Sequence, residues 1–349
     1  FFGVSALGAI VVPFSTWSTR SELEFLVEDS GVEHVFTIDA LGDRRFVADF
    51  RAIQQTPAGA RLGSIVEVHA GADTFNPYAV YRNTMAEPLP LTPGVGASAS
   101  DTLVLLYTSG SSARPKSVPL QHFATVENGF NIGERMGLTA ADKVFVPVPL
   151  FWSYGAVNAL PAIVSHGATM VIQPRFEPSE ALDIIEREQC TALYTLPAMS
   201  NALMSAPGFA ASRTRSLRTG LMIGSPEDVK RCALELGVAE ICNIYGSTET
   251  YGNCCVTPHD WPLEGRAQTQ GPPLPGVAVR IRNAESGAFC GTGEVGSIEV
   301  RGYLTPGYAG NSAQHNGAVF TDDGYFRTGD LGALTREGTL QYAGRSSEM

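Results

Sequence analysis

Hydroxyl side chains are concentrated around a glycine and a lysine in the stretch YTSGSSARPKSVPLQH, residues 107–122. A polyphosphate needs several convergent hydrogen-bond donors and a positive charge. The residues that can supply them are Thr108, Ser109, Gly110, Ser111, Ser112 and Lys116. The stretch is not the Walker phosphate loop GxxxxGK[ST], because Lys116 follows Pro115 and not a glycine. Taken alone, it predicts a phosphate-binding loop and an ordinary polar turn equally well.

A rigid scaffold for this loop is predicted by the apolar runs around it. Short β-rich runs alternate with helix-length segments between residues 102 and 246, which is typical of a parallel sheet with helices on both faces. The predicted strands are 102–110, 143–150, 168–173, 191–196, 217–224 and 240–246. The predicted helices are 123–138, 154–167, 177–189 and 227–237, and Ser179 is the N-cap expected for the third. Ligands of such folds bind at the carboxyl ends of the strands, where the loop is expected.

The pattern changes near residue 276 to short strands separated by glycine and polar turns. The strands predicted there are 277–283, 296–302, 325–335 and 338–345. We therefore predict an α/β fold with two parts. Residues 1–275 form sub-lobes of parallel-rich sheets flanked by helices, and residues 276–343 form a smaller antiparallel β lobe. The Pro-, Gly- and Ala-rich residues 88–101 are expected to be a connector.

Composition excludes several classes of function. A net charge of -11 argues against a nucleic-acid partner, and no apolar run approaches the roughly 20 residues that span a bilayer. The six cysteines include no CxxC pair, so we expect reduced thiols and a cytoplasmic protein. The chain has no initiator Met and ends at GRSSEM, so we expect that both ends are cut.

Five short segments follow one another in a fixed order: YTSGSSARPKSV, then PLFWSYG at 149–155, IYGSTET at 244–250, YFRTGDLG at 325–332 and GR at 344–345. They resemble the signatures of the adenylate-forming superfamily, which includes acyl-CoA synthetases, peptide-synthetase adenylation domains and luciferases. The family's phosphate loop is usually written YTSGSTGxPKGV. The connecting segments GPPLPGVAVRI and GSIEVRG match as well. The resemblance covers essentially the whole chain.

This resemblance implies activation of a carboxylic acid with ATP, and the residue types fit that chemistry. Tyr245 offers an aromatic face for the purine, Thr248 a hydroxyl for the α-phosphate and Glu249 a carboxylate for Mg²⁺. Asp330 can accept hydrogen bonds from two ribose hydroxyls, and Arg345 resembles the second ribose contact. The expected catalytic residues are thus Lys116, Thr248 and Glu249. The expected nucleotide contacts are Gly224, Ser225, Pro226, Tyr245, Gly246, Thr248, Asp330 and Arg345. The alternatives are a solvated Glu249 at a capped strand end and an Asp330 that closes a turn.

The acid pocket is expected at Trp152, Tyr154 and Gly155, which resemble the family's PLFWSYG-type segment. Many family members carry His where this chain has Trp152, and members that activate amino acids carry Asp there to hold the ammonium group. An indole cannot pair with an ammonium group. The resemblance therefore implies an apolar acid, aryl or aliphatic.

The phosphate loop departs from the family pattern at Ser112, where Thr is usual, and at Ala113 and Ser117, where Gly is usual. Glycine permits positive φ, a conformation in which a Cβ costs about 1–2 kcal/mol. We therefore expect a stiffer or differently shaped loop. ATP binding is still expected, with reduced adenylation as an alternative.

The family also carries a small C-terminal lid that follows the GR segment and moves about an acidic hinge. Within residues 344–349, Glu348 resembles the hinge acid, and no lid follows it, so we expect a large N-terminal part of a longer enzyme. The reaction that the resemblance implies forms acyl-AMP from the acid and Mg-ATP and then transfers the acyl group to CoA. The alternatives are a single half-reaction, loading of an acyl-carrier protein, and a nucleotide-binding pseudoenzyme.

Overall fold

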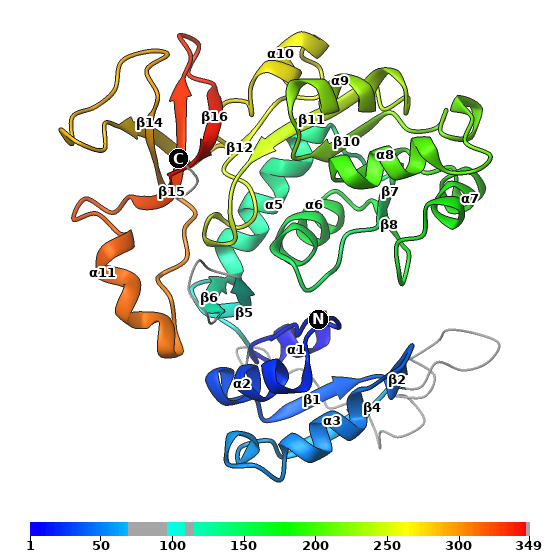
Figure 1. Ribbon diagram of the computed structural model, residues 1–349, viewed down its shortest axis with the longest axis vertical. Helices are drawn as coiled ribbons and strands as arrows, with labels where there is room; N and C mark the ends of the chain where they lie inside the picture. Colours follow the sequence, from blue (N-terminus) through cyan, green and yellow to red (C-terminus); the bar gives the residue numbers. More distant parts are fainter. Residues whose placement is uncertain (69–95, 109–114, 347–349) are drawn as a thin grey trace.

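A computed structural model describes residues 1–68, 96–108 and 115–346 of the chain (Figure 1). The elements form an N-terminal group, drawn in blue, a large central group in green, and a group of orange and red strands on the opposite side of the central helix α5 from α7 and α8. Among the helices of these described ranges, none combines the length and the apolar character that a membrane span requires.

The central group is built on a six-stranded sheet with the strand order β12-β11-β10-β9-β7-β8. Its pairings are parallel, except that β12 runs antiparallel to β11. The strands are β7 (Lys143–Val146), β8 (Thr169–Ile172), β9 (Ala192–Thr195), β10 (Thr219–Met222), β11 (Glu240–Tyr245) and β12 (Cys255–Val256). This sheet confirms the predicted parallel-rich α/β fold.

Helices cover both faces of this sheet, because alternate strand residues point to opposite sides. Phe145, Leu193 and Ile241 pack into one core with α7, α8, α9 and α10, whereas their strand neighbours pack with α5 and α6 into a second core. The helices are α5 (His122–Met136), α6 (Leu160–Ser165), α7 (Pro178–Glu188), α8 (Pro197–Ser205), α9 (Pro226–Leu234) and α10 (Leu263–Gln268). The two cores fix the strand ends from which the site is built.

Two helix starts differ from the sequence prediction. The N-cap of α7 is Glu177, whose carboxylate accepts from the backbone N–H groups of Ser179 and Glu180, so the expectation of Ser179 as the cap is wrong. The reason is Pro178, which favours the first helical position and places the cap one residue before it. The helix expected at 154–167 begins instead as a π-helical segment, η2 (Tyr154–Ala159), before α6.

The strand that precedes the predicted phosphate loop lies outside the six-stranded sheet. β5 (Thr102–Thr108) pairs antiparallel with β6 (Lys116–Gln121) in a sheet of their own. Our sequence analysis did not predict β6, because Pro119 cannot donate a hydrogen bond to a strand partner. The loop was thus expected wrongly at the end of a parallel strand, since it connects an antiparallel pair.

The N-terminal group is a small layer of helices on short strands. β1 pairs in parallel with β4, and α2 and α3 pack on them around Phe50 and Ile53. Thr19 and Glu22 form a capping box that begins α2, and Gly31 ends it in the left-handed conformation. The elements are α1 (Phe2–Ala6), α2 (Arg20–Ser30), β1 (His34–Thr37), β2 (Ala40–Leu41), β3 (Arg44–Arg45), α3 (Phe46–Ile53) and β4 (Ser64–Glu67).

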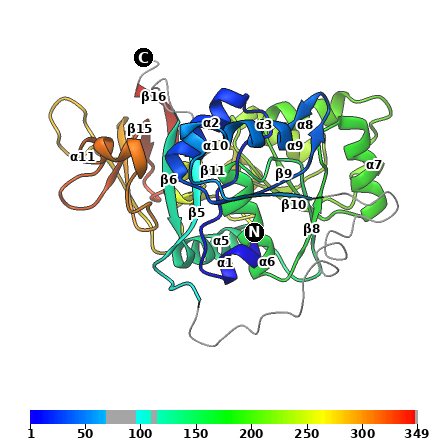
Figure 2. The ribbon, with the colours of Figure 1, turned by 90° about the horizontal axis from the view of Figure 1, so that it is seen from below.

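The C-terminal strands form a four-stranded antiparallel sheet in the order β13-β14-β15-β16. The elements are β13 (Ala278–Arg282), β14 (Gly296–Arg301), η5 (Gly310–His315), α11 (Asn316–Val319), β15 (Phe326–Leu334) and β16 (Leu340–Arg345). The apolar face of this sheet shares a core with Tyr245 at the end of β11. Figure 2 shows the sheet beside β6 and away from α7. The end of β11 therefore meets the C-terminal sheet.

Candidate nucleotide and carboxylate site

Residues from the paired strands β15 and β16 and from the distant end of β11 meet at one carboxylate, that of Asp330 on β15. The Tyr245 hydroxyl donates to its Oδ2 at 2.8 Å, and Arg345 Nε on β16 donates to its Oδ1 at 2.9 Å. Asp330 and Tyr245 are 6 % and 7 % exposed, whereas Arg345 reaches solvent. The structure thus brings together the purine and ribose residues that the sequence analysis predicted.

The electrostatics of this cluster keep Asp330 paired. The negative charge of Asp330 raises the pKa of Arg345 above its usual value. Burial raises the pKa of the Tyr245 hydroxyl well above its usual value, and the charge of Asp330 adds to that effect. Tyr245 therefore acts as a neutral hydrogen-bond donor, and Asp330 keeps a cation beside it.

The Tyr245 ring has a second aromatic neighbour that the sequence analysis did not single out. The Tyr342 ring lies 5.8 Å from it, centroid to centroid, with 28° between the planes. Tyr342 is 44 % exposed, and it follows the buried Leu340 in β16. Sequence reasoning had no signal for it, because the contact depends on the packing of β16 against the end of β11.

The segment expected under the adenine is held by a side chain of β11. Asn243 Oδ1 accepts from the Gly224 N–H at 3.3 Å, and Asn243 Nδ2 donates to the Gly224 carbonyl at 3.2 Å. The next residues begin α9: Ser225 forms a capping box with Asp228, and Pro226 occupies the first turn. Ser225 and Pro226 thus have a local structural role here, and their contact with a nucleotide stays a prediction.

The residues after β11 form a tight turn that needs glycine at position 246. A Cβ on Gly246 would lie 2.4 Å from the Gly252 carbonyl oxygen and 2.5 Å from Asn253 Cα. The following η4 (Thr248–Thr250) carries both Thr248, which is half-buried, and Glu249, which is 9 % exposed. This close approach fixes the two side chains relative to Tyr245.

Glu249 and Lys116 meet at one aromatic side chain, Tyr308. The Tyr308 hydroxyl donates to Glu249 Oε1 at 2.8 Å, and Lys116 Nζ lies 5.0 Å from the centre of the Tyr308 ring. Tyr308 thus brings together the predicted residues Lys116 and Glu249, although it lies in none of the five segments that resemble the family. A lone tyrosine between turn residues gives no sequence signal.

The strand end at the phosphate loop is well defined, whereas the loop is not described. Thr108 pairs with Lys116 where β5 and β6 meet. Gln189 and Tyr251 are the described non-glycine residues with positive φ, so Ser117 does not adopt the conformation that would require a glycine. The other predicted loop residues lie outside the described residues, as does the predicted hinge acid: Ser109, Gly110, Ser111, Ser112, Ala113 and Glu348.

The predicted acid-pocket residues differ in their surroundings. Trp152 is 36 % exposed, and its ring meets the exposed Trp17 edge-on at 5.4 Å. Tyr154 lies in the core, and its hydroxyl donates to the Leu221 carbonyl at 2.7 Å. Gly155 is the second residue of the π-helical segment, and a Cβ there would lie 2.4 Å from the Pro149 carbonyl oxygen. Trp152 is therefore the accessible side chain of the three.

The donor set fits magnesium held partly by a substrate. Within the described ranges, no three His, Cys, Asp or Glu residues cluster so as to hold a metal ion. Mg²⁺ is usually bound through one or two carboxylates together with substrate phosphates. Among the described residues, Tyr308 is the one hydrogen-bond partner of the Glu249 carboxylate, and it uses Oε1. The second oxygen, Oε2, has no hydrogen-bond partner among the described residues.

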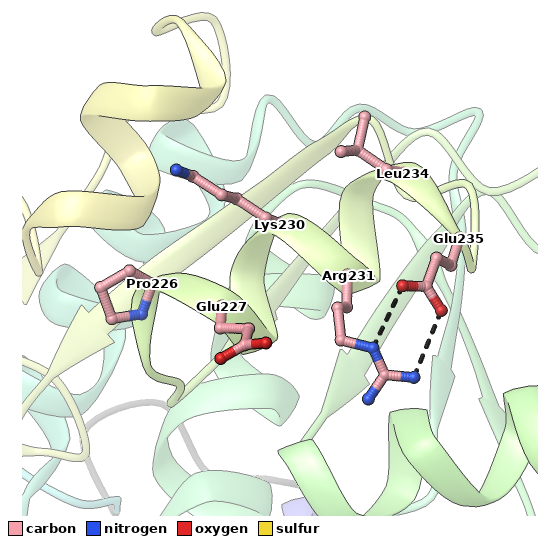
Figure 3. Close-up of a pocket in the computed structure, with 6 residues that line it drawn as sticks. All are labelled: Pro226, Glu227, Lys230, Arg231, Leu234 and Glu235. Atoms are coloured by element: carbon pink, nitrogen blue, oxygen red, sulfur yellow. Dashed lines mark hydrogen bonds and ion pairs between the residues drawn. The ribbon is translucent and has the colours of Figure 1, made fainter.

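A separate pocket lies along α9 (Figure 3). It is lined by Pro226, Glu227, Lys230, Arg231, Leu234 and Glu235. Arg231 Nε pairs with Glu235 Oε1 at 3.1 Å across one helical turn, in an exposed ion pair of the kind that contributes little to stability. Pro226 is the one predicted site residue in its wall, so this pocket does not include the Asp330 or Glu249 clusters.

Curated proteins similar to this chain include acyl-CoA ligases. Acyl-CoA ligase sidI of Aspergillus fumigatus is 29% identical over 364 residues, covering 100% of this chain and 62% of its own length. Indoleacetate--CoA ligase of Aromatoleum aromaticum is 31% identical over 353 residues, covering 100% and 66%. The chain thus spans less than two thirds of these relatives.

Solved structures show the same fold. ATP-bound MatB from Rhodopseudomonas palustris superposes with a TM-score of 0.82 at 26% identity, covering 97% of this chain and 64% of that one. The o-succinylbenzoate CoA synthetase MenE from Bacillus subtilis, in complex with ATP and magnesium ion, gives 0.80 at 25% identity, covering 100% and 66%. The sequence model described as AMP-binding enzyme matches residues 1–309. The chain therefore belongs to the AMP-binding enzyme family, within the adenylate-forming superfamily.

Proposed function

We propose that this chain is the nucleotide-binding part of an acyl-CoA synthetase, which activates a carboxylic acid with ATP and passes the acyl group to CoA. The single observation that carries the proposal is the cluster in which the buried Tyr245 and the exposed Arg345 both bond to the buried carboxylate of Asp330. In a nucleotide site, a carboxylate can accept hydrogen bonds from the two ribose hydroxyls, and an aromatic face beside it can pack against the purine. The names of the acyl-CoA ligase relatives support the acid–thiol chemistry.

In this proposal the chain's own residues hold and orient the reactants. Asp330 and Arg345 bind the ribose, Tyr245 lies against the adenine together with Gly224, and Thr248 donates to the α-phosphate. Lys116 and the loop before it bind the terminal phosphates. Magnesium, held by Glu249, would neutralise phosphate charge when it is bound. The acid attacks the α-phosphorus through its carboxylate oxygen, pyrophosphate leaves, and the CoA thiol then displaces AMP.

We further propose an apolar acid, aryl or aliphatic, because Trp152 is the accessible side chain of the predicted acid pocket and carries no charge for an ammonium group. CoA is the proposed thiol, and an acyl-carrier protein is the alternative acceptor. A cytoplasmic location is proposed from the thiols, since all six cysteines are free.

One alternative comes from the phosphate loop. Ala113 and Ser117 stand where the family pattern has glycines, and these substitutions would permit an enzyme that performs only one half-reaction. ATP–pyrophosphate exchange with a panel of carboxylic acids separates the cases. Exchange that depends on an apolar acid is the expected result. AMP release from a supplied acyl-AMP and CoA, without exchange, would support the half-reaction, and nucleotide binding without either would support a pseudoenzyme.

A further inference from the structure

A short stretch between β14 and η5, residues 305–309, joins the two ends of the predicted phosphate site. It contacts the strand after the phosphate loop at two points: Thr305 Oγ1 donates to the Pro119 carbonyl at 2.7 Å, and the Ala309 N–H donates to the Ser117 carbonyl at 3.0 Å. It contacts Glu249 through the Thr305 N–H, which donates to the Glu249 carbonyl at 2.8 Å. The stretch is therefore tied to both the Lys116 strand and the Glu249 turn.

Tyr308 is the side chain of this stretch that reaches Glu249. It is 6 % exposed, and its hydroxyl donates to Glu249 Oε1 at 2.8 Å. Its backbone is fixed on both sides by Asn316, whose Oδ1 accepts from the Tyr308 N–H at 2.8 Å and whose Nδ2 donates to the Tyr308 carbonyl at 3.0 Å. A buried side chain with a fixed backbone has little freedom, so it holds the carboxylate in one orientation.

The Tyr308 ring also contacts the predicted phosphate lysine. Lys116 Nζ lies 5.0 Å from its centroid, within the range at which a cation is attracted to an aromatic face. Tyr308 thus touches both charged groups that a Mg-polyphosphate would need, the anion through its hydroxyl and the cation through its ring.

We propose that Tyr308 is a positioning residue that holds the Glu249 carboxylate by Oε1, directs Oε2 toward the metal, and couples metal binding to Lys116. This inference rests on the proposed function. Partners that orient a metal-binding carboxylate typically contribute 10–100-fold to metal affinity. AMP needs neither the metal nor the terminal phosphates, so its binding does not depend on Tyr308.

The test replaces Tyr308 with Phe, which removes the hydroxyl and keeps the ring. Mn²⁺ binding in the presence of ATP is measured by electron paramagnetic resonance, and AMP binding by calorimetry, both on the full chain. We expect Tyr308→Phe to weaken Mn²⁺ binding about 10-fold and to change AMP affinity less than about 2-fold. Tyr303→Phe is the matched control, because Tyr303 lies earlier in the same connection and its ring packs on Phe123 of α5.

The outcomes separate this inference from the proposed function. If the unsubstituted chain binds neither Mn²⁺ with ATP nor AMP, both are overturned. If it binds them and Tyr308→Phe binds Mn²⁺ equally well, only the role of Tyr308 is overturned. An equal loss of Mn²⁺ and AMP binding would show a structural role and would overturn the inference too.

A double variant shows whether Tyr308 acts through Glu249 or through a general loss of stability. If Tyr308 acts through Glu249, Tyr308→Phe combined with Glu249→Gln binds Mn²⁺ no worse than Glu249→Gln alone. Additive losses would contradict the proposal.

Discussion

At the scale of single residues, the Asp330 carboxylate combines burial with room for further hydrogen bonds. Each of its oxygens accepts one bond, from Tyr245 at Oδ2 and from Arg345 at Oδ1. An ionised carboxylate offers about four lone-pair directions, so two ribose hydroxyls can bind without displacing either partner. The existing bonds hold the carboxylate still before a nucleotide arrives, which lowers the entropic cost of binding.

Asp330→Ala should weaken AMP binding by about 1–3 kcal/mol, because the charge-assisted bonds to ribose are lost. Isothermal calorimetry on the folded variant measures this directly. Tyr245→Phe is the control, because it keeps the ring beside Tyr342 and removes only the hydroxyl, so it should cost less. An Asp330→Ala variant with unchanged AMP affinity would exclude Asp330 from the site.

The residues that bear the chemistry could be predicted from sequence, and their partners could not. Tyr245, Asp330 and Glu249 stand in short segments whose residue types suit a nucleotide. Tyr308 stands in no such segment, and Asn243 directly precedes one without a predicted role. They matter because folding places them 2.8 Å from Glu249 Oε1 and 3.3 Å from the Gly224 N–H. Contacts between segments so far apart in the chain depend on tertiary packing, which local sequence does not encode.

At the scale of elements, β6 accounts for one departure from the family pattern. The Ser117 hydroxyl donates to the Ala309 carbonyl at 2.6 Å, and Ser117 is 1 % exposed. The side chain that replaces the usual glycine thus fastens β6 to the stretch that carries Tyr308. The strand itself was not predictable by strand rules, because Pro119 interrupts it, whereas the parallel strands β7 to β11 of the central sheet were predicted within a few residues. The short antiparallel strand β12 was not predicted.

Ser117→Gly should lower the free energy of unfolding by about 1–2 kcal/mol, since a buried hydrogen bond is lost and glycine weakens a strand. Urea denaturation followed by circular dichroism gives the value. Ser117→Ala separates the two causes, because it removes the hydroxyl alone and should cost about 1 kcal/mol. A glycine variant as stable as the original chain would show that the Ala309 bond contributes nothing.

The connection between α5 and β7 contains Asp142, whose carboxylate should make the free energy of unfolding depend on pH. Asp142 is buried, and although burial raises its pKa, hydrogen bonds from Thr191, Thr139 and Arg218 lower the pKa below its usual value. Because the folded pKa lies below the unfolded value of about 3.9, the resulting stability is present above pH 4 and is lost as the pH falls through the folded pKa. Asp142→Asn should cost about 2 kcal/mol at pH 7 and less at pH 3, as urea denaturation at both values would measure. An equal cost at the two values would contradict this assignment.

At the scale of the whole molecule, the site lies where the C-terminal sheet meets the end of β11 (Figure 1). The apolar contact there includes Tyr245, Ile298 and Leu340, and the polar bond from Tyr245 to Asp330 lies beside it. A nucleotide that touches Gly224 and Asp330 would contact both groups of elements at once. Binding should therefore stabilise the joint between them and not one group alone.

Hydrogen exchange followed by mass spectrometry tests this at the level of the whole chain. With AMP at about 100 times its dissociation constant, linkage predicts about 2.7 kcal/mol of added stability for any opening that releases the nucleotide. Slower exchange is expected in β11 and also in β15 and β16, because the ligand joins them. Little change is expected in the N-terminal helices α2 and α3, because they contain none of the predicted nucleotide contacts. In the Asp330→Ala variant, AMP should protect β15 and β16 less than it protects β11, because Gly224 and Tyr245 still face the purine. Protection confined to the central sheet in the unsubstituted chain would mean that the nucleotide binds without the C-terminal sheet.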